Sequence, residues 1–294
     1  MKTRFPARTA TACAVLLCLF FPLFAALLGG DAISAAAATV SAGEAVMEVY
    51  SGRVLFENNG GKRLPMASTT KILTAAIVVE DCDLDEKVTV PREGAGVEGS
   101  SVYLKAGEEY TVRQLLYGLM LRSGNDCAVT LALHHSGSVE AFAVEMNRRA
   151  ASWGAENSHF TNPHGLPDEA HYTTALDLAR IACHAMQNPT FRTIVSTKYF
   201  GENAWANKNK MLFSYEGANG VKTGFTKRAG RCLVTGAKRG NMQLVSVVLN
   251  SPEMYERSAE LLDAAFRKYT LLRLYAPETE FAAPDEKRFA GAER

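Results

Sequence analysis

The strand-forming segments of this 294-residue chain lie at its two ends and are separated by a helical middle. Short connections join successive runs within each end, which makes neighbouring strands antiparallel. The sequence therefore predicts the α/β class, of α+β type. One five-stranded antiparallel sheet flanked by helices is closed by both chain ends, and an all-helical lobe is inserted in its middle. The β-type runs occupy residues 45–50, 53–57, 220–224, 231–237 and 242–249.

Apolar residues recur at helical spacing through the middle of the chain. A helix is predicted to begin at or near Ser68, because a proline three residues earlier cannot lie inside it and the residues that follow have its period. Thr111, with a glutamine three residues later, predicts a capping box at the start of another helix. Residues 87–90 and 101–104 are predicted as short strands around a glycine-rich link. A long amphipathic helix is predicted to begin at Pro252.

The N-terminal residues 1–38 have the order of a secretory signal. A basic stretch is followed by an apolar run over residues 10–28 and by alanines that fit cleavage after residues 36–38. The apolar run approaches the length of a membrane span, so the segment is either cleaved on export or retained as an anchor. Both alternatives predict a secreted or extracytoplasmic protein. Residues 39–275 would form its folded domain, and residues 276–294 a charged tail.

The charges and cysteines exclude several classes of function. Lys plus Arg number 32 against 31 Asp plus Glu, without long blocks of either sign, so no nucleic acid partner is predicted and a small molecule or peptide is favoured. The cysteines beyond the signal are widely spaced and form no C-x-x-C pair, which indicates neither a zinc site nor a disulfide framework. Buried free thiols are the favoured interpretation and a single disulfide is the alternative. These cysteines are Cys82, Cys127, Cys183 and Cys232.

Three short motifs carry the chemistry of the chain. Ser68 and Lys71 form an S-x-x-K pattern at the predicted helix start, where residues three apart are neighbours on one face and backbone N–H groups are unpaired. That arrangement combines a nucleophile, a possible base and an oxyanion donor. A Ser-Gly-Asn motif at residues 123–125 lies in a predicted helix-to-helix loop, and a Lys-Thr-Gly motif at residues 222–224 lies on a strand. We expect all three to face one crevice.

This ordered set resembles the penicillin-recognising serine enzymes, and in particular the serine D-alanyl-D-alanine carboxypeptidases, the low-molecular-mass penicillin-binding proteins of peptidase family S11. The resemblance implies a β-lactamase/transpeptidase-like fold without a cofactor or metal. The implied substrate is a peptidoglycan stem peptide ending in D-Ala-D-Ala, and β-lactams are the implied inhibitors. The resemblance spans roughly residues 42–269. The matching stretches are residues 65–71, 97–101, 121–126, 162–166 and 220–226.

The resemblance also implies a role for each site residue. Ser68 would be the nucleophile, Lys71 its base and Ser123 a proton relay. Because only about one free lysine in 2,500 is neutral at pH 7, the pKa of Lys71 must be lowered by burial or by a second charge such as Lys222. The backbone N–H groups of Ser68 and Phe225 would form the oxyanion hole. The substrate-binding residues implied are Asn125, Lys222, Thr223, Gly224 and Phe225.

Other features of the sequence leave alternatives open. His164 lies in a matching loop, where a structural role is favoured over proton transfer. A serine β-lactamase is one competing function, and it needs a deacylating acid for which Glu169 is a candidate. A non-catalytic penicillin-binding or wall-binding module is the other. Many relatives continue into a small β-rich domain and a membrane anchor, for which the residues after Tyr275 are too few, so membrane contact would come only from an uncleaved N-terminal segment. Surface or cap roles are predicted for His134, His135, His159, His171 and His184.

Overall fold

The computed structural model describes residues 41–201 and 205–271. The predicted signal, residues 1–38, and the predicted tail, residues 276–294, lie outside the described residues. So do the first two cysteines of the chain and the last four residues of the predicted folded domain.

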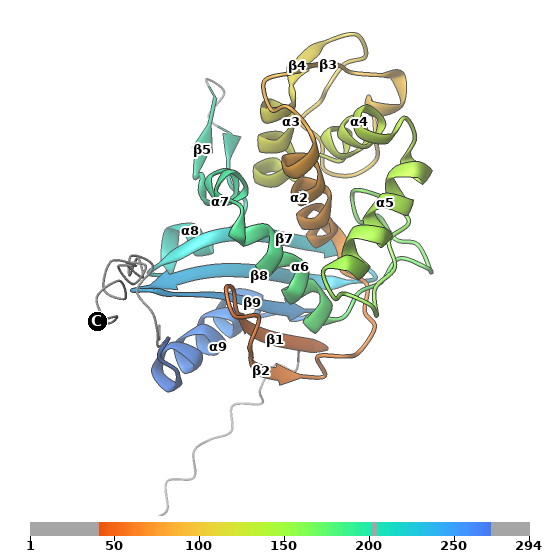
Figure 1. Ribbon diagram of the computed structural model, residues 1–294. Coiled ribbons are helices and arrows are strands. Elements are labelled where there is room, and N and C mark those ends of the chain that lie inside the picture. The colour runs from red at the N-terminus through yellow and green to blue at the C-terminus, as the bar shows by residue number, and fades with distance from the viewer. Residues whose placement is uncertain (1–40, 202–204, 272–294) are drawn as a thin grey trace, which may run out of the picture. The chain divides into compact units, whose positions relative to one another are not determined.

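A five-stranded antiparallel sheet forms the centre of the described unit, in the order β2-β1-β9-β8-β7 (Figure 1). This confirms the predicted sheet: the strands from the start and end of the chain meet where β1 pairs with β9. The β1–β2 connection spans residues 49–53, whereas the predicted runs leave only residues 51–52 between them. Within it the Glu48 carboxylate accepts hydrogen bonds from the N–H and hydroxyl of Ser51, both at 2.7 Å. The strands are β1 (Gly43–Glu48), β2 (Val54–Asn58), β7 (Ala218–Thr226), β8 (Gly230–Arg239) and β9 (Met242–Leu249).

Helices cover both faces of the sheet, which explains why every residue of β9 is buried, including the polar Gln243 and Ser246. Alternate residues of a strand point to opposite faces. Val245, Val247 and Leu249 enter the larger core, whereas Leu244 and Val248 enter the smaller core beneath the C-terminal helix. The helices packed on the sheet are α6 (Ala175–Gln187), α7 (Pro189–Ser196) and α9 (Met254–Lys268).

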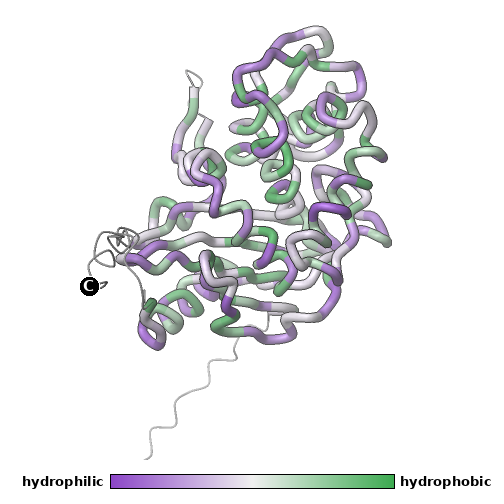
Figure 2. The backbone as a smooth tube through the Cα atoms, in the orientation of Figure 1, coloured by the Kyte–Doolittle hydropathy of each residue, from purple (hydrophilic) through white to green (hydrophobic). Residues whose placement is uncertain are grey.

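The lobe beside the sheet is built mainly of helices whose backbone alternates between hydrophobic and hydrophilic stretches (Figure 2), as amphipathic helices do. The turn η1 runs directly into α2, so the helix predicted near Ser68 is confirmed. The Thr111–Gln114 capping box is confirmed as well. The lobe comprises η1 (Ala67–Thr70), α2 (Lys71–Asp81), η2 (Arg92–Gly94), α3 (Val112–Tyr117), η3 (Gly118–Arg122), α4 (Asn125–Ser136) and α5 (Val139–Ser152).

Two short antiparallel ribbons accompany the helices. β3 (Lys87–Thr89) pairs with β4 (Glu109–Thr111), so the strand predicted at residues 101–104 is wrong. Two backbone N–H groups of that segment donate to the Asp126 carboxylate instead of to a strand partner. The second ribbon joins β5 (Tyr199–Phe200) to β6 (Trp205–Ala206) and leads to α8 (Met211–Ser214). The last helix begins at Met254, two residues after the predicted start.

Candidate active site

The serine of the S-x-x-K motif lies in the tight turn η1, where the chain enters α2. Threonine hydroxyls brace this turn: Thr69 Oγ1 donates to the Met66 carbonyl at 2.6 Å, and Thr70 Oγ1 donates to the Ala67 carbonyl at 2.8 Å. The Ser68 side chain is only partly buried. Ala67, directly before Ser68, has a φ of 49°, in the left-handed region that residues other than glycine rarely adopt. The turn therefore holds the Ser68 hydroxyl at the protein surface on a rigid backbone.

Lys71 lies beside this hydroxyl and is completely buried. Its Nζ is 3.0 Å from Ser68 Oγ, 2.7 Å from Asn125 Oδ1 and 2.7 Å from the His164 carbonyl. An ammonium would donate to all three oxygens. A neutral amine can donate to only two, and the two carbonyl oxygens, of Asn125 and His164, cannot donate in return. They therefore direct the nitrogen lone pair of a neutral Lys71 towards the Ser68 hydroxyl proton.

Burial and neighbouring lysines both favour this neutral form. Burial lowers the pKa of Lys71 well below its ordinary value, and the charges of Lys222 and Lys208 lower it further, while Cys127 and Asp126 act in the opposite direction. Lys222, which is also buried, donates to the Thr223 carbonyl at 2.9 Å. Burial, followed by the charge of Lys208, lowers the pKa of Lys222 to about 7. The site can thus hold a lysine base at neutral pH.

Lys208 belongs to this cationic group and was not predicted. It lies between β6 and α8, and its Nζ is 3.3 Å from Ser100 Oγ. Buried asparagines on either side hold the segment: Asn207 Nδ2 donates to the Thr197 carbonyl, and Asn209 Oδ1 accepts from the Met211 N–H. The Asn-x-Asn pattern was the only signal in the sequence, and it marks a fixed backbone rather than a function.

The Ser-Gly-Asn motif connects η3 to α4. Ser123 has a φ of 66° and its side chain is buried. Asn125 is used at both ends of its amide, because Oδ1 accepts from Lys71 and Nδ2 donates to the Glu98 carbonyl at 2.6 Å. Its backbone N–H donates to the Ser100 carbonyl at 2.7 Å. In this structure Asn125 therefore orients Lys71 and binds residues 98–100.

The Lys-Thr-Gly motif lies on β7, one of the two edge strands of the sheet. A Cβ atom at Gly224 would lie 3.0 Å from the Met66 carbonyl oxygen and 3.1 Å from the backbone nitrogen of Ser68. The missing side chain therefore lets the strand lie against turn η1. Thr223 is partly buried, and Phe225 is exposed at the outer end of the motif. Direct hydrogen bonds join Lys71 to Ser68 and to Asn125. The chain brings three further predicted residues to the site as sequence neighbours of Asn125, Lys222 and Gly224: Ser123, Thr223 and Phe225.

The loop at residues 162–166 lies against α2 and contributes backbone carbonyls to the site. Thr74 Oγ1 donates to the Pro163 carbonyl at 2.7 Å, and Lys71 binds the next carbonyl, that of His164. Burial, followed by the charge of Lys71, lowers the pKa of His164 to about 3, and its Nδ1 accepts from the Leu166 N–H. A neutral His164 supplies its backbone carbonyl to the site, in agreement with the structural role predicted for it.

His171 corrects the prediction of a surface or cap role. It is buried, and burial lowers its pKa to about 4. Its Nδ1 accepts from the Thr161 N–H at 3.0 Å, so the proton of the neutral ring is on Nε2, 2.8 Å from Thr70 Oγ1. The sequence placed His171 in a polar loop, but the bridge between Leu64 and Thr173 brings that loop to turn η1, where the ring contacts Thr70. The buried His171 ring thus contacts turn η1 through Thr70.

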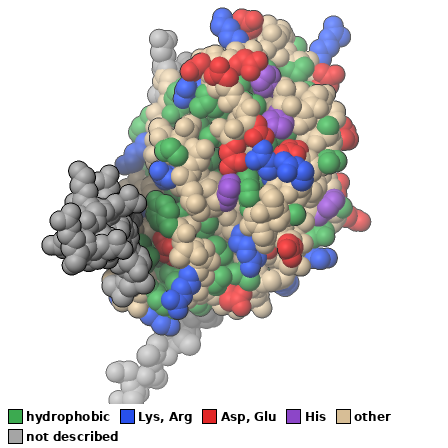
Figure 3. Space-filling model, in the orientation of Figure 1, with side chains coloured by type: hydrophobic (Ala, Val, Ile, Leu, Met, Phe, Trp, Pro, Cys, Tyr) green, Lys and Arg blue, Asp and Glu red, His purple; other side chains and the backbone are tan. Residues whose placement is uncertain are grey.

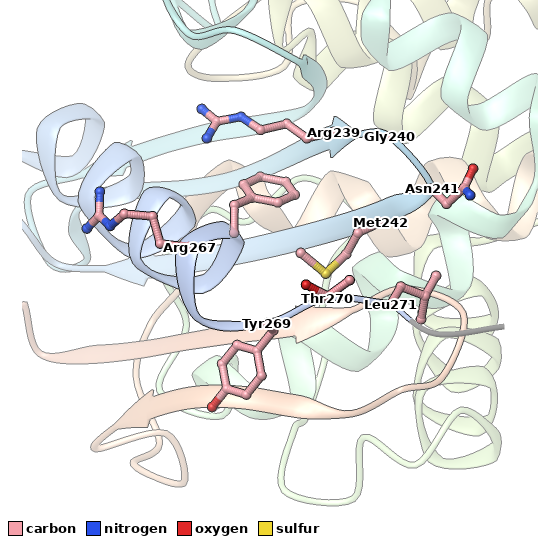
Figure 4. A pocket seen from close by; sticks show the side chains of 9 residues that line it. Arg239, Gly240, Asn241, Met242, Arg267, Tyr269, Thr270 and Leu271 are labelled. Carbon is pink, nitrogen blue, oxygen red and sulfur yellow. The ribbon is translucent and has the colours of Figure 1, made fainter. Parts of the chain in front are cut away.

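The described surface also has two hollows away from the three motifs. Residues 41–271, apart from 202–204, contain no group of His, Cys, Asp and Glu side chains that could hold a metal ion. A hollow of about 420 Å³ lies between the β8–β9 turn and the end of α9 (Figure 4), and a second of about 370 Å³ lies between β2 and α9; none of the predicted site residues lines either. On the face shown in Figure 3, acidic and basic side chains are interspersed.

Two further findings concern cysteines and membranes. Cys82, Cys127, Cys183 and Cys232 are all free; the last three are buried, in agreement with the favoured interpretation of buried thiols, whereas Cys82 is only partly buried. None of the helices in the described part of the chain combines the length and the apolar character needed to cross a membrane.

Comparisons with known proteins agree with this geometry. A family model described as D-alanyl-D-alanine carboxypeptidase matches residues 31–253. The chain is 37% identical to D-alanyl-D-alanine carboxypeptidase DacF of Bacillus subtilis, over 78% of this chain and 63% of that protein. It is 36% identical to the D-alanyl-D-alanine carboxypeptidase of Streptomyces sp. strain K15, over 80% of this chain and 91% of that protein. This chain thus spans less than two thirds of the length of the Bacillus relative.

Solved structures confirm the predicted fold. The Streptomyces K15 DD-transpeptidase superposes with a TM-score of 0.72 at 35% identity, covering 77% of this chain and 97% of that chain. The D-alanyl-D-alanine carboxypeptidase DacD from Francisella tularensis gives a TM-score of 0.73 at 29% identity, covering 81% of this chain and 74% of that chain. By sequence and by fold, this chain belongs to the D-alanyl-D-alanine carboxypeptidase family, peptidase family S11.

Proposed function

We propose that this protein is a serine-type D-Ala-D-Ala carboxypeptidase that removes the terminal D-alanine of peptidoglycan stem peptides through an acyl-enzyme at Ser68. The observation that carries the proposal is the buried Lys71 amine, 3.0 Å from the Ser68 hydroxyl and bound by two carbonyl oxygens. A base without its proton beside a partly exposed serine is what acyl transfer requires.

Acylation uses the site as follows. Lys71 takes the Ser68 proton as Ser68 Oγ attacks the carbonyl carbon of the penultimate D-alanine. The developing oxyanion is bound by the backbone N–H groups of Ser68 and Phe225. Lys71 passes that proton through Ser123 to the departing amine, and D-alanine leaves as the ester on Ser68 forms. Water then attacks the ester and its proton passes to the neutral Lys71, which gives it to the departing Ser68 Oγ, so that Ser68 is regenerated with release of the shortened peptide.

The terminal carboxylate of the substrate would bring a negative charge to the lysine cluster, which consists of Lys71, Lys208 and Lys222. Burial, followed by the charge of Lys208, lowers the pKa of Lys222 to about 7, and both lysines repel the charged form of Lys71. A carboxylate bound by Lys222, Thr223 and Lys208 would offset this repulsion by direct charge pairing. The proposal thus assigns Lys208 a substrate-binding role beside the residues of the motif.

The two competing functions are less well supported. Glu169, the candidate deacylating acid of a β-lactamase, is exposed on its loop rather than held beside Ser68. A non-catalytic binding module would not need a buried lysine whose pKa is held low by burial and by other lysines, because that arrangement costs folding free energy.

Release of D-alanine from an acylated D-Ala-D-Ala peptide tests the proposal. The wild-type chain is expected to release D-alanine and to form a long-lived adduct with penicillin, whereas Ser68→Ala does neither. Ser214→Ala, at an exposed serine of α8, is the matched control and should behave as wild type. Rapid turnover of penicillin would favour the β-lactamase, and peptide binding without release would favour the binding module.

The proposal includes export. Residues 1–38 would direct the chain across the cytoplasmic membrane, so that residues 39–275 act at the cell wall or at the outer face of that membrane. N-terminal sequencing of protein exported from expressing cells should find a chain that starts after one of residues 36–38, or the intact N-terminus in the membrane fraction. Recovery of the intact chain in the cytoplasm alone would contradict export.

A further inference from the structure

Tyr103 is held in an unusual backbone conformation and exposes its ring. Its φ is 66°, in the left-handed region that bulky residues avoid. Its exposed fraction is 84%, the highest of the large exposed hydrophobic residues in the described part of the chain. Such a conformation costs on the order of 1–3 kcal/mol and persists only where the surroundings impose it. The ring itself is barely packed, so the protein gains little stability from having tyrosine there.

A buried carboxylate imposes the conformation. Asp126 is fully buried and accepts hydrogen bonds from the N–H groups of Val102 at 3.0 Å and Leu104 at 3.1 Å, and from Ser101 Oγ at 2.5 Å. The Tyr103 N–H donates to Ser101 Oγ at 2.8 Å. The N–H groups of residues 102, 103 and 104 are therefore all hydrogen-bonded to Asp126 or Ser101, and the Tyr103 side chain is exposed to solvent.

The same segment lies against the site. The Ser100 carbonyl accepts the Asn125 N–H at 2.7 Å, and Ser100 Oγ is 3.3 Å from Lys208 Nζ. The Glu98 carbonyl accepts from Asn125 Nδ2 at 2.6 Å. Three residues of backbone span at most about 11 Å, so the Cα atom of Tyr103 lies within that distance of the Cα atom of Ser100. We call residues 98–104 the anchored segment, since it is bound both to the site and to Asp126.

We propose that Tyr103 is a specificity-determining residue that contacts the part of the peptide substrate preceding D-Ala-D-Ala, and that Asp126 is the positioning residue that presents it. The inference rests on the proposed function. The terminal dipeptide is expected to fill the buried part of the site around Ser68 and Lys222, so the preceding residues must leave along the rim. An exposed tyrosine on a backbone held by hydrogen bonds offers such a chain a large apolar surface, and its two side-chain torsions limit the freedom lost on binding.

The experiment compares two substrates on the full-length chain. N-acetyl-D-Ala-D-Ala ends at the buried part of the site, whereas a diacetylated Lys-D-Ala-D-Ala peptide extends past it. Tyr103→Ala should lower kcat/KM for the longer peptide about 5- to 20-fold, mainly through KM, and change the shorter one less than twofold. Tyr103→Phe should retain most of the preference. Tyr199→Ala, at another exposed tyrosine, is the matched control.

A stability measurement separates this role from a structural one. Tyr103→Gly removes the backbone strain at φ 66° and should unfold at the same or a higher temperature than wild type while losing the preference for the longer peptide. Equal loss on both substrates, or an unchanged preference, would overturn the inference. Wild-type protein that releases no D-alanine from either peptide would instead overturn the proposed function, so the two failures are distinguishable.

Discussion

Replacement of Lys222 by methionine should stabilise the fold while abolishing its activity. Lys222 is completely buried, and its one hydrogen bond goes to the neighbouring Thr223 carbonyl. Methionine fills a similar volume without the charge, so Lys222→Met removes the desolvation cost of the ammonium with little change in packing. The variant should not release D-alanine, because we propose that this charge binds the substrate carboxylate.

The magnitude follows from the pKa of Lys222. A fall from the ordinary value of 10.5 to about 7 corresponds to roughly 5 kcal/mol of unfolding free energy. Loss of the hydrogen bond would take back about 1 kcal/mol. We therefore expect Lys222→Met to gain up to about 4 kcal/mol at pH 6.

The pH dependence has a definite sign. Between pH 7 and 10.5 the unfolded state binds more protons at Lys222 than the folded state does, so wild-type stability rises with pH in that window. The cost of Lys222 is fully present below pH 7 and is lost as the pH approaches 10.5. The advantage of the variant should therefore be largest at pH 6 and close to zero or slightly negative at pH 10.

Urea unfolding of both proteins at pH 6, 8 and 10, followed by tryptophan fluorescence, measures the difference. Lys62→Met, at an exposed lysine, is the control and should change the unfolding free energy little at any pH. A variant that is less stable than wild type at pH 6, or a difference that does not shrink with pH, would refute the reasoning.

Three further substitutions test the geometry of the site. Gly224→Ala brings a methyl group to 3.1 Å from the Ser68 nitrogen, so kcat should fall at least about tenfold with a small loss of stability, measured by D-alanine release and thermal unfolding. Asp126→Asn removes a charge that raises the pKa of Lys71, so the acid limb of the kcat/KM profile should move to lower pH; an unmoved limb would contradict this. Lys208→Met removes a charge that lowers the same pKa, so its limb should move to higher pH and KM should rise; a shift in the same direction as that of Asp126→Asn would contradict the assignment.

The sheet could be predicted because its determinants are local. Alternating and continuous apolar runs mark the strands, and tight turns make β7, β8 and β9 antiparallel neighbours. The pairing of β1 with β9 joins residues about 200 positions apart, and it was predicted only by placing the strands of both chain ends in one sheet, without any local signal. The helix start near Ser68 was likewise visible, since a proline and an apolar period define it.

The residues that the sequence did not reveal are those defined by distant contacts. Residues 101–104 have the composition of a strand, but a buried carboxylate 22 to 25 positions later binds them. His171 lies in a polar stretch, and only the fold brings its ring to Thr70. Lys208 belongs to no motif. It comes near Lys71 and Lys222 only because the fold brings together α2, β7 and the segment between β6 and α8. The short motifs predict the reacting groups, but not the residues whose charges shift the pKa of Lys71.

The central claim is that Lys71 makes Ser68 the nucleophile. Intact-mass measurement after treatment with benzylpenicillin, followed by peptide mapping, tests it directly, because opening of the β-lactam ring adds the whole inhibitor mass to the acylated residue. We predict a single long-lived adduct on the peptide that contains Ser68 in wild type, and none in Ser68→Ala or at early times in Lys71→Met. An adduct on another residue, or one that forms in Lys71→Met as fast as in wild type, would contradict the account.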